Sequence, residues 1–458
     1  MNLRELKSWL SRHPARAGAF AGWIQQGVSL SSALLLVPVV TTCLPPAEAG
    51  IWFVFQSMVG MLSLTDLGFG FAITRQAAFT IGGPATVKDT GFLRLAPGWD
   101  GLAQLFRLTR RLYFFLALGA GLIGVAIFEV IATTGDLASS VSPSARYCWY
   151  FLVVAVTLLV GSGGRAAFLN GLGLIYQTRL ATAGYLATAA FGAALAAFLG
   201  GGLPAMGAAY AVAAVAHYLV LILICMLSAP KLRSSDTQPI PPGSLRSLCK
   251  ASLPVGGVNI FGSLMYSGQT PLLGFLLGPE KVAPFFVAQK IALACSQAVL
   301  HTVTPQMPFF TRQYGAGNYA AALRLMNATL FRTAVMALVA SGLFCLLSPI
   351  AAKILLPTTE YLTHLPLGLL AIDVFLLTLT VPFAWFVLAS GKNPFVMTTV
   401  VGGILNLGFC VFLVPRLGVS GIPLSSILAG LVTNHWFAVW RALVLRWELG
   451  AGKSCGRY

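Results

Sequence analysis

Apolar runs of about twenty residues recur along the whole chain, and this feature restricts the possible fold more than any other. A helix that crosses the hydrocarbon core of a bilayer needs about 20 mainly apolar residues, and such runs follow one another here with short polar breaks. Of the 458 residues, 57% are hydrophobic and only 9% are charged, whereas a soluble domain carries about 25% charged residues. The sequence therefore predicts an all-α integral membrane protein, with the lipid bilayer as its surroundings.

We expect twelve transmembrane helices, arranged as two pseudo-symmetric six-helix lobes around a central cavity. The predicted spans are 17–42, 50–80, 109–132, 146–169, 178–199, 207–228, 250–277, 284–310, 326–349, 366–389, 395–415 and 421–444. The longest polar break is rich in proline and separates the sixth span from the seventh. It predicts an N-terminal lobe (1–228), a cytoplasmic linker (229–249) and a C-terminal lobe (250–458).

The positive charges predict the orientation of these spans. If the connections are assigned to alternate sides of the membrane, 24 of the 29 Lys and Arg residues fall on the side of the two termini and 4 on the other side. Cytoplasmic loops carry such an excess of positive charge, so both termini are expected in the cytoplasm. The net charge of +17 lies in these short connections, which argues against nucleic acid as a partner.

The two predicted lobes resemble each other in sequence. Leu44–Gln56 is similar to Leu277–Gln289, and each segment opens a span that closes on Thr-Arg-Gln, at Thr74–Gln76 and at Thr311–Gln313. Six spans separate the two copies, so both copies cross the membrane in the same direction. Parallel repeats of this kind occur in transporters that work by alternating access.

The reactive residue types form no pattern that indicates catalysis or a cofactor. The eight cysteines include no Cys-x-x-Cys pair, and most lie within apolar segments, where cysteine is a packing residue. Walker loops, His-Glu-x-x-His and Asp-x-Asp motifs are absent from the sequence. We therefore expect no metal site, no cofactor and no catalytic residue.

A polar cluster lies inside the second span, in the run from Ser63 to Gln76. It contains an acid (Asp66), two glycines and a base (Arg75). An ionisable group at membrane depth usually faces the bundle interior or a wet cavity, because it is costly in lipid. Two structural explanations stay open: Asp66 pairs with a polar neighbour, and Arg75 marks the cytoplasmic end of its helix.

Further polar residues lie within other spans. Lys290 is a candidate for attracting an anionic group, or it reaches the membrane surface with its long side chain. Asp373 either carries a proton, balances Lys290 or is a hydrogen-bonded buried acid. The remaining polar candidates, which line a cavity or bond to other helices, are His217, His301, Gln25, Gln26, Asn259, Gln269 and Asn406.

A basic segment with aromatic residues, Lys88–Arg111, precedes the third span. Because it is amphipathic and basic, we expect it to lie on the anionic cytoplasmic leaflet. Topology alone would place positive charge there, so this segment predicts no specific site.

Several short motifs resemble those of a known family. Asp66-Leu-Gly-Phe-Gly-Phe-Ala-Ile-Thr-Arg75 resembles the "DLGFG…R" signature near the second helix of bacterial polysaccharide transporters, and Leu44–Trp52 is similar to the turn before it. Asn170–Gly173 and Gly418–Gly421 are similar to family motifs after the fourth span and before the last. The chain thus resembles the Wzx-type O-antigen flippases, whose superfamily also contains the multidrug and toxic-compound exporters and the lipid II flippases.

The resemblance implies transfer of an undecaprenyl-diphosphate-linked oligosaccharide across the bacterial inner membrane, coupled to an ion gradient. It implies a cationic cavity, for which Arg75, Arg165, Lys290 and Arg312 are the candidate diphosphate ligands. Asp66 and Asp373 are the candidate ion-coupling acids. Glycosyltransferases and a polysaccharide polymerase are further expected partners. Lipid II flippases commonly carry two extra helices for which this chain has no room, which argues against lipid II as the substrate.

Two other functions stay open. One is a cation-coupled multidrug exporter of the same superfamily, and the other is a membrane polysaccharide polymerase or ligase. Such an enzyme should have a long extracytoplasmic loop with reactive groups. The longest predicted outer loops, near 133–145 and 350–365, are short and carry only Asp136 and Glu360 as acids, which argues against the enzyme.

Overall fold

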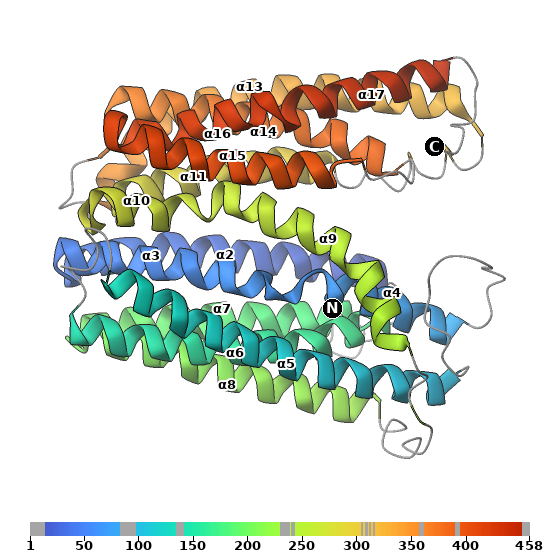
Figure 1. The fold of residues 1–458 in the computed structure, drawn as a ribbon, viewed down its shortest axis with the longest axis horizontal. Coiled ribbons are helices and arrows are strands. Elements are labelled where there is room, and N and C mark those ends of the chain that lie inside the picture. Colours follow the sequence, from blue (N-terminus) through green and yellow to red (C-terminus); the bar gives the residue numbers. More distant parts are fainter. Residues whose placement is uncertain are drawn as a thin grey trace, which may run out of the picture. The chain divides into compact units, whose positions relative to one another are not determined.

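The computed structural model describes most of the chain, and the elements of the described part are all helical (Figure 1). The described residues are 14–82, 98–133, 142–229, 239, 243–303, 306, 310, 313–314, 317–356, 361–389 and 394–450. The chain divides into two compact units, Met1–Ile260 (unit 1) and Phe261–Tyr458 (unit 2). The boundary falls within a helix, and much of the predicted linker at 229–249 lies outside the described residues.

Unit 1 contains the first six spans and most of a helix that continues into unit 2. Its elements are α2 (Pro14–Cys43), α3 (Pro46–Leu62), the 3-10 helix η1 (Ser63–Asp66), α4 (Phe69–Gly82), α5 (Gly98–Thr133), α6 (Pro143–Gly171), α7 (Ile175–Phe198), α8 (Gly202–Ser228) and α9 (Ser244–Tyr266). Helix α6 is the centre of the unit, since it packs against α3, α4, α5 and α8. Figure 1 shows α5, α6 and α8 running side by side.

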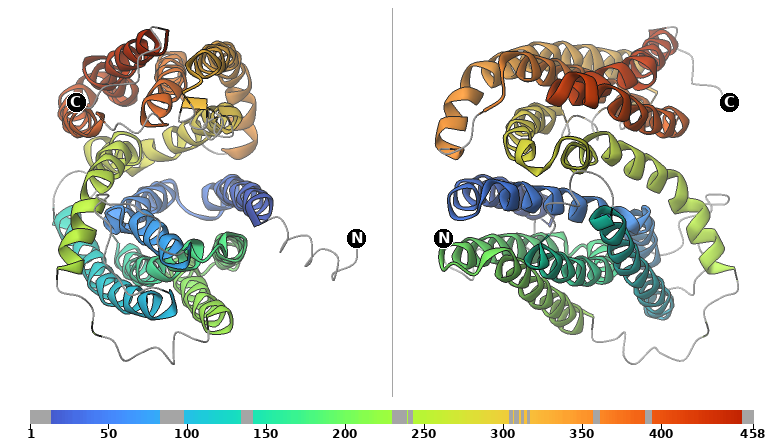
Figure 2. Two further views of the ribbon diagram at one scale, coloured as in Figure 1. Left: turned by 90° about the vertical axis from the view of Figure 1, so that its right-hand side faces the viewer. Right: turned by 60° about the vertical axis from the view of Figure 1, so that its left-hand side comes forward.

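Unit 2 contains the end of the seventh span and the last five spans, coloured yellow to red in Figure 2. Its elements are α10 (Gln269–Leu277), η4 (Pro279–Lys281), α11 (Val282–Val303), α13 (Tyr319–Leu355), α14 (His364–Ala389), α15 (Val396–Leu417), η5 (Gly418–Ser420), α16 (Gly421–Val432) and α17 (Asn434–Gly450). Helix α14 contacts α11, α13, α16 and α17.

The twelve predicted spans are confirmed as helices, three of them broken: the second (α3, η1 and α4), the seventh (α9 and α10) and the twelfth (α16 and α17). Among the described residues, nine helical stretches are long and apolar enough to cross a membrane. The second span is not in that set because its break leaves two shorter helices, and the seventh span is not in it either. The last two spans count as the single stretch Val396–Gly450. The chain is thus a multi-pass membrane protein.

The two units repeat the same arrangement of neighbouring helices. In unit 1 the second, third and fourth spans pack on one another, the fifth packs on the first and the sixth, and the sixth packs on the fourth. Each of these pairs recurs between the corresponding spans of unit 2. The fourth span of each half, α6 or α14, is therefore the hub of its unit.

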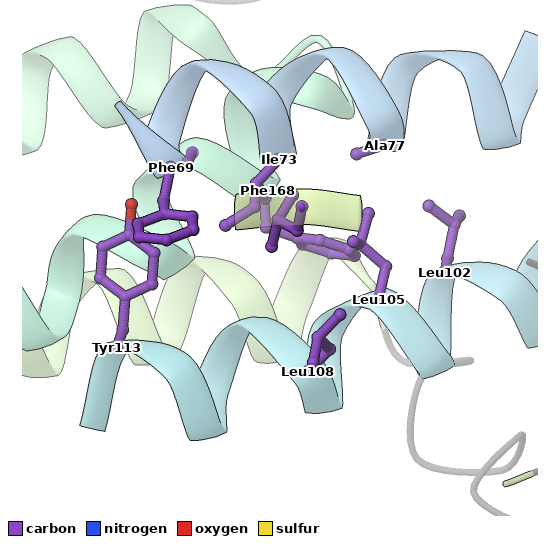
Figure 3. Close-up of a cluster of buried hydrophobic side chains, with 10 residues drawn as sticks. Phe69, Ile73, Ala77, Leu102, Leu105, Leu108, Tyr113 and Phe168 are labelled. Carbon is purple, nitrogen blue, oxygen red and sulfur yellow. The ribbon is translucent and has the colours of Figure 1, made fainter. Parts of the chain in front are cut away.

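Helices α4, α5 and α6 form a tightly packed cluster in unit 1. Figure 3 shows the buried side chains of this cluster: Phe69, Ile73, Ala77, Leu102, Leu105, Leu108, Tyr113 and Phe168. The helix backbones approach closely because glycine occupies the contacts. A Cβ atom on Gly171 would lie 2.6 Å from the carbonyl oxygen of Thr74, so a larger residue would force α6 away from α4.

Candidate functional site

The acid of the sequence signature, Asp66, lies at the break in the second span. Leu67 and Gly68 have positive φ angles of 50° and 75° and separate η1 from α4. The Asp66 carboxylate accepts a hydrogen bond from the backbone N–H of Gly70 at 3.1 Å and another from the Tyr113 hydroxyl. A carboxylate is favourable at a helix N-terminus, where N–H groups have no partner within the helix. The polar partner expected for Asp66 is therefore found.

The same break is in contact with α9. A Cβ atom on Gly256 would lie 2.4 Å from the carbonyl oxygen of Leu67. No residue other than glycine fits this approach without displacement of one backbone. Because α5 and α9 hold the break from different sides, its geometry depends on two distant stretches of sequence. Tyr113 and Gly256 were not identified from the sequence, since neither belongs to a local motif.

Arg165 lies near the end of α6 and lines a pocket of about 640 Å³ between α5, α6 and α8. Its guanidinium carbon lies 4.6 Å from the centroid of the Tyr218 ring, a distance suited to a cation–π contact. Arg110 and Arg111 of α5 line the same pocket, and the lining contains no carboxylate. The basic segment Lys88–Arg111 was expected on the membrane surface, and its residues from Gly98 onward form the first part of α5.

Lys290 lies in α11 of unit 2, with an exposed side chain. Its ammonium nitrogen lies 5.0 Å from the centroid of the Phe286 ring, one helical turn earlier. No salt bridge joins it to an acid among the described residues. A cation of this kind is available to an anionic ligand.

Asp373 lies in the interior of α14 and is 1% exposed. Its Oδ1 atom has no hydrogen-bond partner among the described residues, and neither does Oγ of the nearby Ser426. The side chain of Tyr266 is also within electrostatic reach of this carboxyl group. A charged carboxylate that is buried with one oxygen unpaired is costly. Asp373 is therefore suited to hold a proton or a small cation.

Polar side chains satisfy the break between α9 and α10. Gln289 of α11 donates to the carbonyl oxygen of Tyr266 at 3.0 Å and to Oε1 of Gln269 at 2.8 Å. It also accepts from the hydroxyl of Thr270 at 3.2 Å. Asn406 of α15, which is fully buried, donates to the carbonyl oxygen of Met265 at 3.2 Å. Backbone groups freed within a membrane helix need such partners, so Gln269 and Asn406 are bonded to other helices.

The remaining polar candidates have varied surroundings. Gln25 is partly buried and Gln26 is exposed on α2. His217 is buried on α8, with its Nδ1 atom 3.2 Å from the carbonyl oxygen of Ala181. The side chains of Arg75, Asn259 and His301 and the whole of Arg312 lie outside the described part. Among the described residues, no group of three or more His, Cys, Asp or Glu is placed to hold a metal ion.

Only two of the four predicted diphosphate ligands have described side chains, and they lie in different units, so the grouping of the four stays a prediction. Arg165 belongs to unit 1 and Lys290 to unit 2, and each is described within its own unit. The structure adds residues that sequence reasoning missed: Tyr113 beside Asp66, Gln289 at the second break, Ser426 near Asp373, and Arg110 and Arg111 beside Arg165. Charge alone identified the last two as basic, but not as pocket residues.

Comparison with solved structures identifies the fold as that of MATE family transporters. The chain is similar to an inward-facing multidrug resistance MATE family transporter of the MOP superfamily, with 16% identity, a TM-score of 0.71 and coverage of 95% of this chain and 99% of that chain. It also matches an outward-facing transporter of the same description, with 16% identity, a TM-score of 0.59 and coverage of 97% of both chains.

A third similar structure is a MOP superfamily transporter from Pyrococcus furiosus, with 17% identity, a TM-score of 0.63 and coverage of 96% of each chain. That structure is described as having a binding pocket of reverse polarity, which suggests a different function for that transporter. No family model matches the sequence, and no curated protein matches it. The fold of this chain is therefore that of MATE transporters, and sequence identities this low leave its substrate to be argued from its own residues.

Proposed function

We propose that the protein is a flippase for undecaprenyl-diphosphate-linked oligosaccharides, the units of O-antigen or a related polysaccharide. It moves them from the inner to the outer leaflet of the bacterial inner membrane by alternating access. The family resemblance of the sequence motifs supports this proposal, and so does the transporter fold. The membrane polymerase or ligase receives no support, because the similar structures are described as transporters.

The observation that carries the proposal is the polarity of the charges that the helices present. The Arg165 pocket contains three arginines and no carboxylate, and Lys290 is exposed on α11. The two intramembrane acids are less available, since Asp66 is bonded at the start of α4 and Asp373 is buried. Guanidinium groups bind phosphate with strong, often bidentate hydrogen bonds. This arrangement suits an anionic cargo better than a cationic drug.

The residue roles follow from this polarity. Arg75, Arg165, Lys290 and Arg312 are our proposed ligands of the diphosphate. Gln25, Gln26, Asn259 and Gln269 are proposed to provide polar contacts along the transport path. Asp66 and Asp373 are proposed to couple transport to an ion gradient, and the protein receives its cargo from glycosyltransferases and passes it to a polymerase.

A cation-coupled multidrug exporter is the second candidate. The observation that favours it is the match to multidrug resistance transporters over nearly the whole chain. The two functions differ in the charge of the cargo, so one preparation can test both.

The test uses the purified protein in liposomes. A fluorescently labelled lipid-diphosphate oligosaccharide placed in one leaflet should reach the other leaflet faster than in protein-free vesicles, as measured by quenching with a membrane-impermeant reagent. Ethidium uptake is measured in the same vesicles under the same ion gradient. Movement of ethidium without movement of the lipid would overturn the flippase proposal in favour of the exporter.

A further inference from the structure

The pocket around Arg165 has cationic side chains at one end and apolar side chains beyond them, which matches the charged head group and apolar chain of a lipid. On α5, Arg110, Phe114 and Leu118 follow one another at intervals of four residues, so they lie on one face of the helix. Phe114, Phe115 and Leu118 are 64%, 66% and 50% exposed, and they line the pocket together with the arginines. Leu118 follows Arg110 by eight positions, about 12 Å along the helix. The cations thus lie at one end of the pocket and the apolar side chains extend away from them.

The packing of α5 on α6 places Arg165 at the same level as the other two arginines. A Cβ atom on Gly164 would meet the Tyr113 ring at 2.6 Å, and one on Gly161 would lie 3.5 Å from Cβ of Ala117. The contact partner has a higher number on α5 where it has a lower number on α6 (Tyr113 with Gly164, Ala117 with Gly161), so the two helices are antiparallel. Arg165 therefore lies level with the turn of α5 that begins at Arg110.

The three guanidinium groups keep donors for a ligand. The guanidinium of Arg165 lies over the Tyr218 ring, and with five N–H donors it can make this contact and still donate to a ligand. Arg110 and Arg111 have exposed side chains. No acidic residue lines the pocket, so its net charge is strongly positive. One phosphate group would neutralise this charge only in part, whereas a diphosphate carries more negative charge and more acceptor oxygens.

We propose that Arg110, Arg111 and Arg165 form a capture site for the diphosphate head group of a prenyl-type lipid in the cytoplasmic leaflet. The lipid chain lies over Phe114, Phe115 and Leu118. The positive-inside pattern places this end of α5 and α6 at the cytoplasmic side, where a lipid-linked cargo would be collected. The inference rests on the proposed function in taking this lipid to be the cargo.

Binding to the purified full-length protein in detergent tests the site directly, with farnesyl diphosphate as the probe. The double variant Arg110→Gln/Arg111→Gln and the single variant Arg165→Gln should each weaken binding by about tenfold or more, because a hydrogen bond to a charged group is lost. Arg165→Lys, which keeps the charge, should lose less. The control is Arg332→Gln, which changes an exposed arginine of α13 and should leave the affinity unchanged. Unfolding midpoints of all variants identify any that fail to fold.

Two further ligands separate a lipid site from a site for free phosphate. Inorganic pyrophosphate tests the head group alone, and farnesol tests the chain alone. Farnesyl diphosphate should bind more tightly than either, and Phe114→Ser/Phe115→Ser should reduce its advantage over pyrophosphate. Equal binding of pyrophosphate and farnesyl diphosphate, or equal binding by the wild type and the arginine variants, would overturn the proposal.

The liposome assay distinguishes failure of the site from failure of the proposed function. If the arginine variants bind the probe and move the labelled lipid as the wild type does, the capture site is wrong and the flippase stands. If the wild type binds the probe through the arginines but moves no lipid-linked oligosaccharide, the site stands and the flippase is wrong.

Discussion

At the scale of single residues, the two intramembrane acids differ in what surrounds them. Asp66 accepts hydrogen bonds from Gly70 and Tyr113 at the start of α4. Asp373 is buried in α14 with an oxygen that has no partner among the described residues. Of the two proposed coupling acids, the structure therefore favours Asp373 as the one that changes its proton or cation during transport, and Asp66 as a residue that stabilises the break.

Replacement of Asp373 should abolish coupling. Asp373→Asn removes the charge but keeps the size of the side chain, so liposome transport should no longer respond to an imposed pH gradient. Tyr113→Phe serves as the control. It should keep this response and lower the free energy of unfolding by about 1.5–3 kcal/mol, because it removes a hydrogen bond to a charged group. An unchanged pH response in Asp373→Asn would exclude this acid from proton coupling.

Replacement of Lys290 should stop transport of an anionic cargo. Lys290→Ala should abolish surface polysaccharide in a deletion strain that expresses the variant, while Lys290→Arg keeps much of it, because the positive charge at this position is retained. The polysaccharide ladder on a gel is the measurement. Lys353→Ala, which changes an exposed lysine at the end of α13, is the matched control. A normal ladder from Lys290→Ala would remove this lysine from the site.

The sequence identified which residues are unusual but not what they contact. Asp66 and Asp373 stood out because a charge in an apolar run is costly. Their partners did not, since Tyr113 lies 47 positions from Asp66, and an aromatic residue or a serine in a helix is ordinary. Long-range packing decides which ordinary residue meets an unusual one, and local sequence carries little of that information.

At the scale of elements, the breaks in the second and seventh spans carry much of the polar chemistry. Each interrupts a helix within a membrane span and leaves backbone groups without helical partners. A carboxylate satisfies the first break, and amide side chains from α11 and α15 satisfy the second. Discontinuous helices of this kind form binding sites in transporters, where half-helix ends face the ligand.

The second break should depend on Gln289. Gln289→Leu leaves the carbonyl oxygen of Tyr266 and the amide of Gln269 without a partner, at a cost of about 1–3 kcal/mol for each buried group. The expected result is a lower free energy of unfolding, measured by denaturant titration in detergent. Gln297→Leu changes an exposed glutamine of the same helix and should be nearly neutral. Equal effects of the two substitutions would show that the amide does not stabilise the break.

Periodicity and length predicted the helices well and the breaks poorly. A run of apolar residues marks a span whether or not its backbone is continuous, so 50–80 and 250–277 were each expected as one helix. The glycines of the Asp66-Leu-Gly-Phe-Gly signature allow a membrane helix to bend, but they equally allow close approach of a neighbouring helix. The break at Ser267–Gly268 had Gly268 and Pro271 as signals, and both residue types are common in membrane helices.

At the scale of the whole molecule, the chain consists of two units with the same neighbouring pairs of helices. This arrangement was predictable, because the spans, their number and the weak repeat can each be identified from short stretches of sequence. The contact between α5 and α6 that gathers three arginines was not, since it depends on small residues whose role emerges only when two helices are aligned.

The predicted orientation can be tested by cysteine accessibility. In a variant without native cysteines, Thr363→Cys, which lies before α14, should react with an impermeant thiol reagent added to intact spheroplasts. Asn318→Cys lies just before α13, and α13 separates it from Thr363. It should react only after the membrane is opened, because the positive-inside pattern places it in the cytoplasm. Both native residues have exposed side chains. The reverse labelling pattern would invert the topology and move the Arg165 pocket to the outer leaflet.

The correspondence between α6 and α14 as hubs also bears on how such a chain arose. Six helices form an even number, so a gene for one unit, copied and joined to itself, yields a second half that inserts the same way as the first. The ancestor then needed neither dual orientation nor an added helix to make the fusion work. Two joined copies can diverge separately, and the two units of this chain differ in charge: unit 1 holds the pocket with three arginines and unit 2 the buried Asp373.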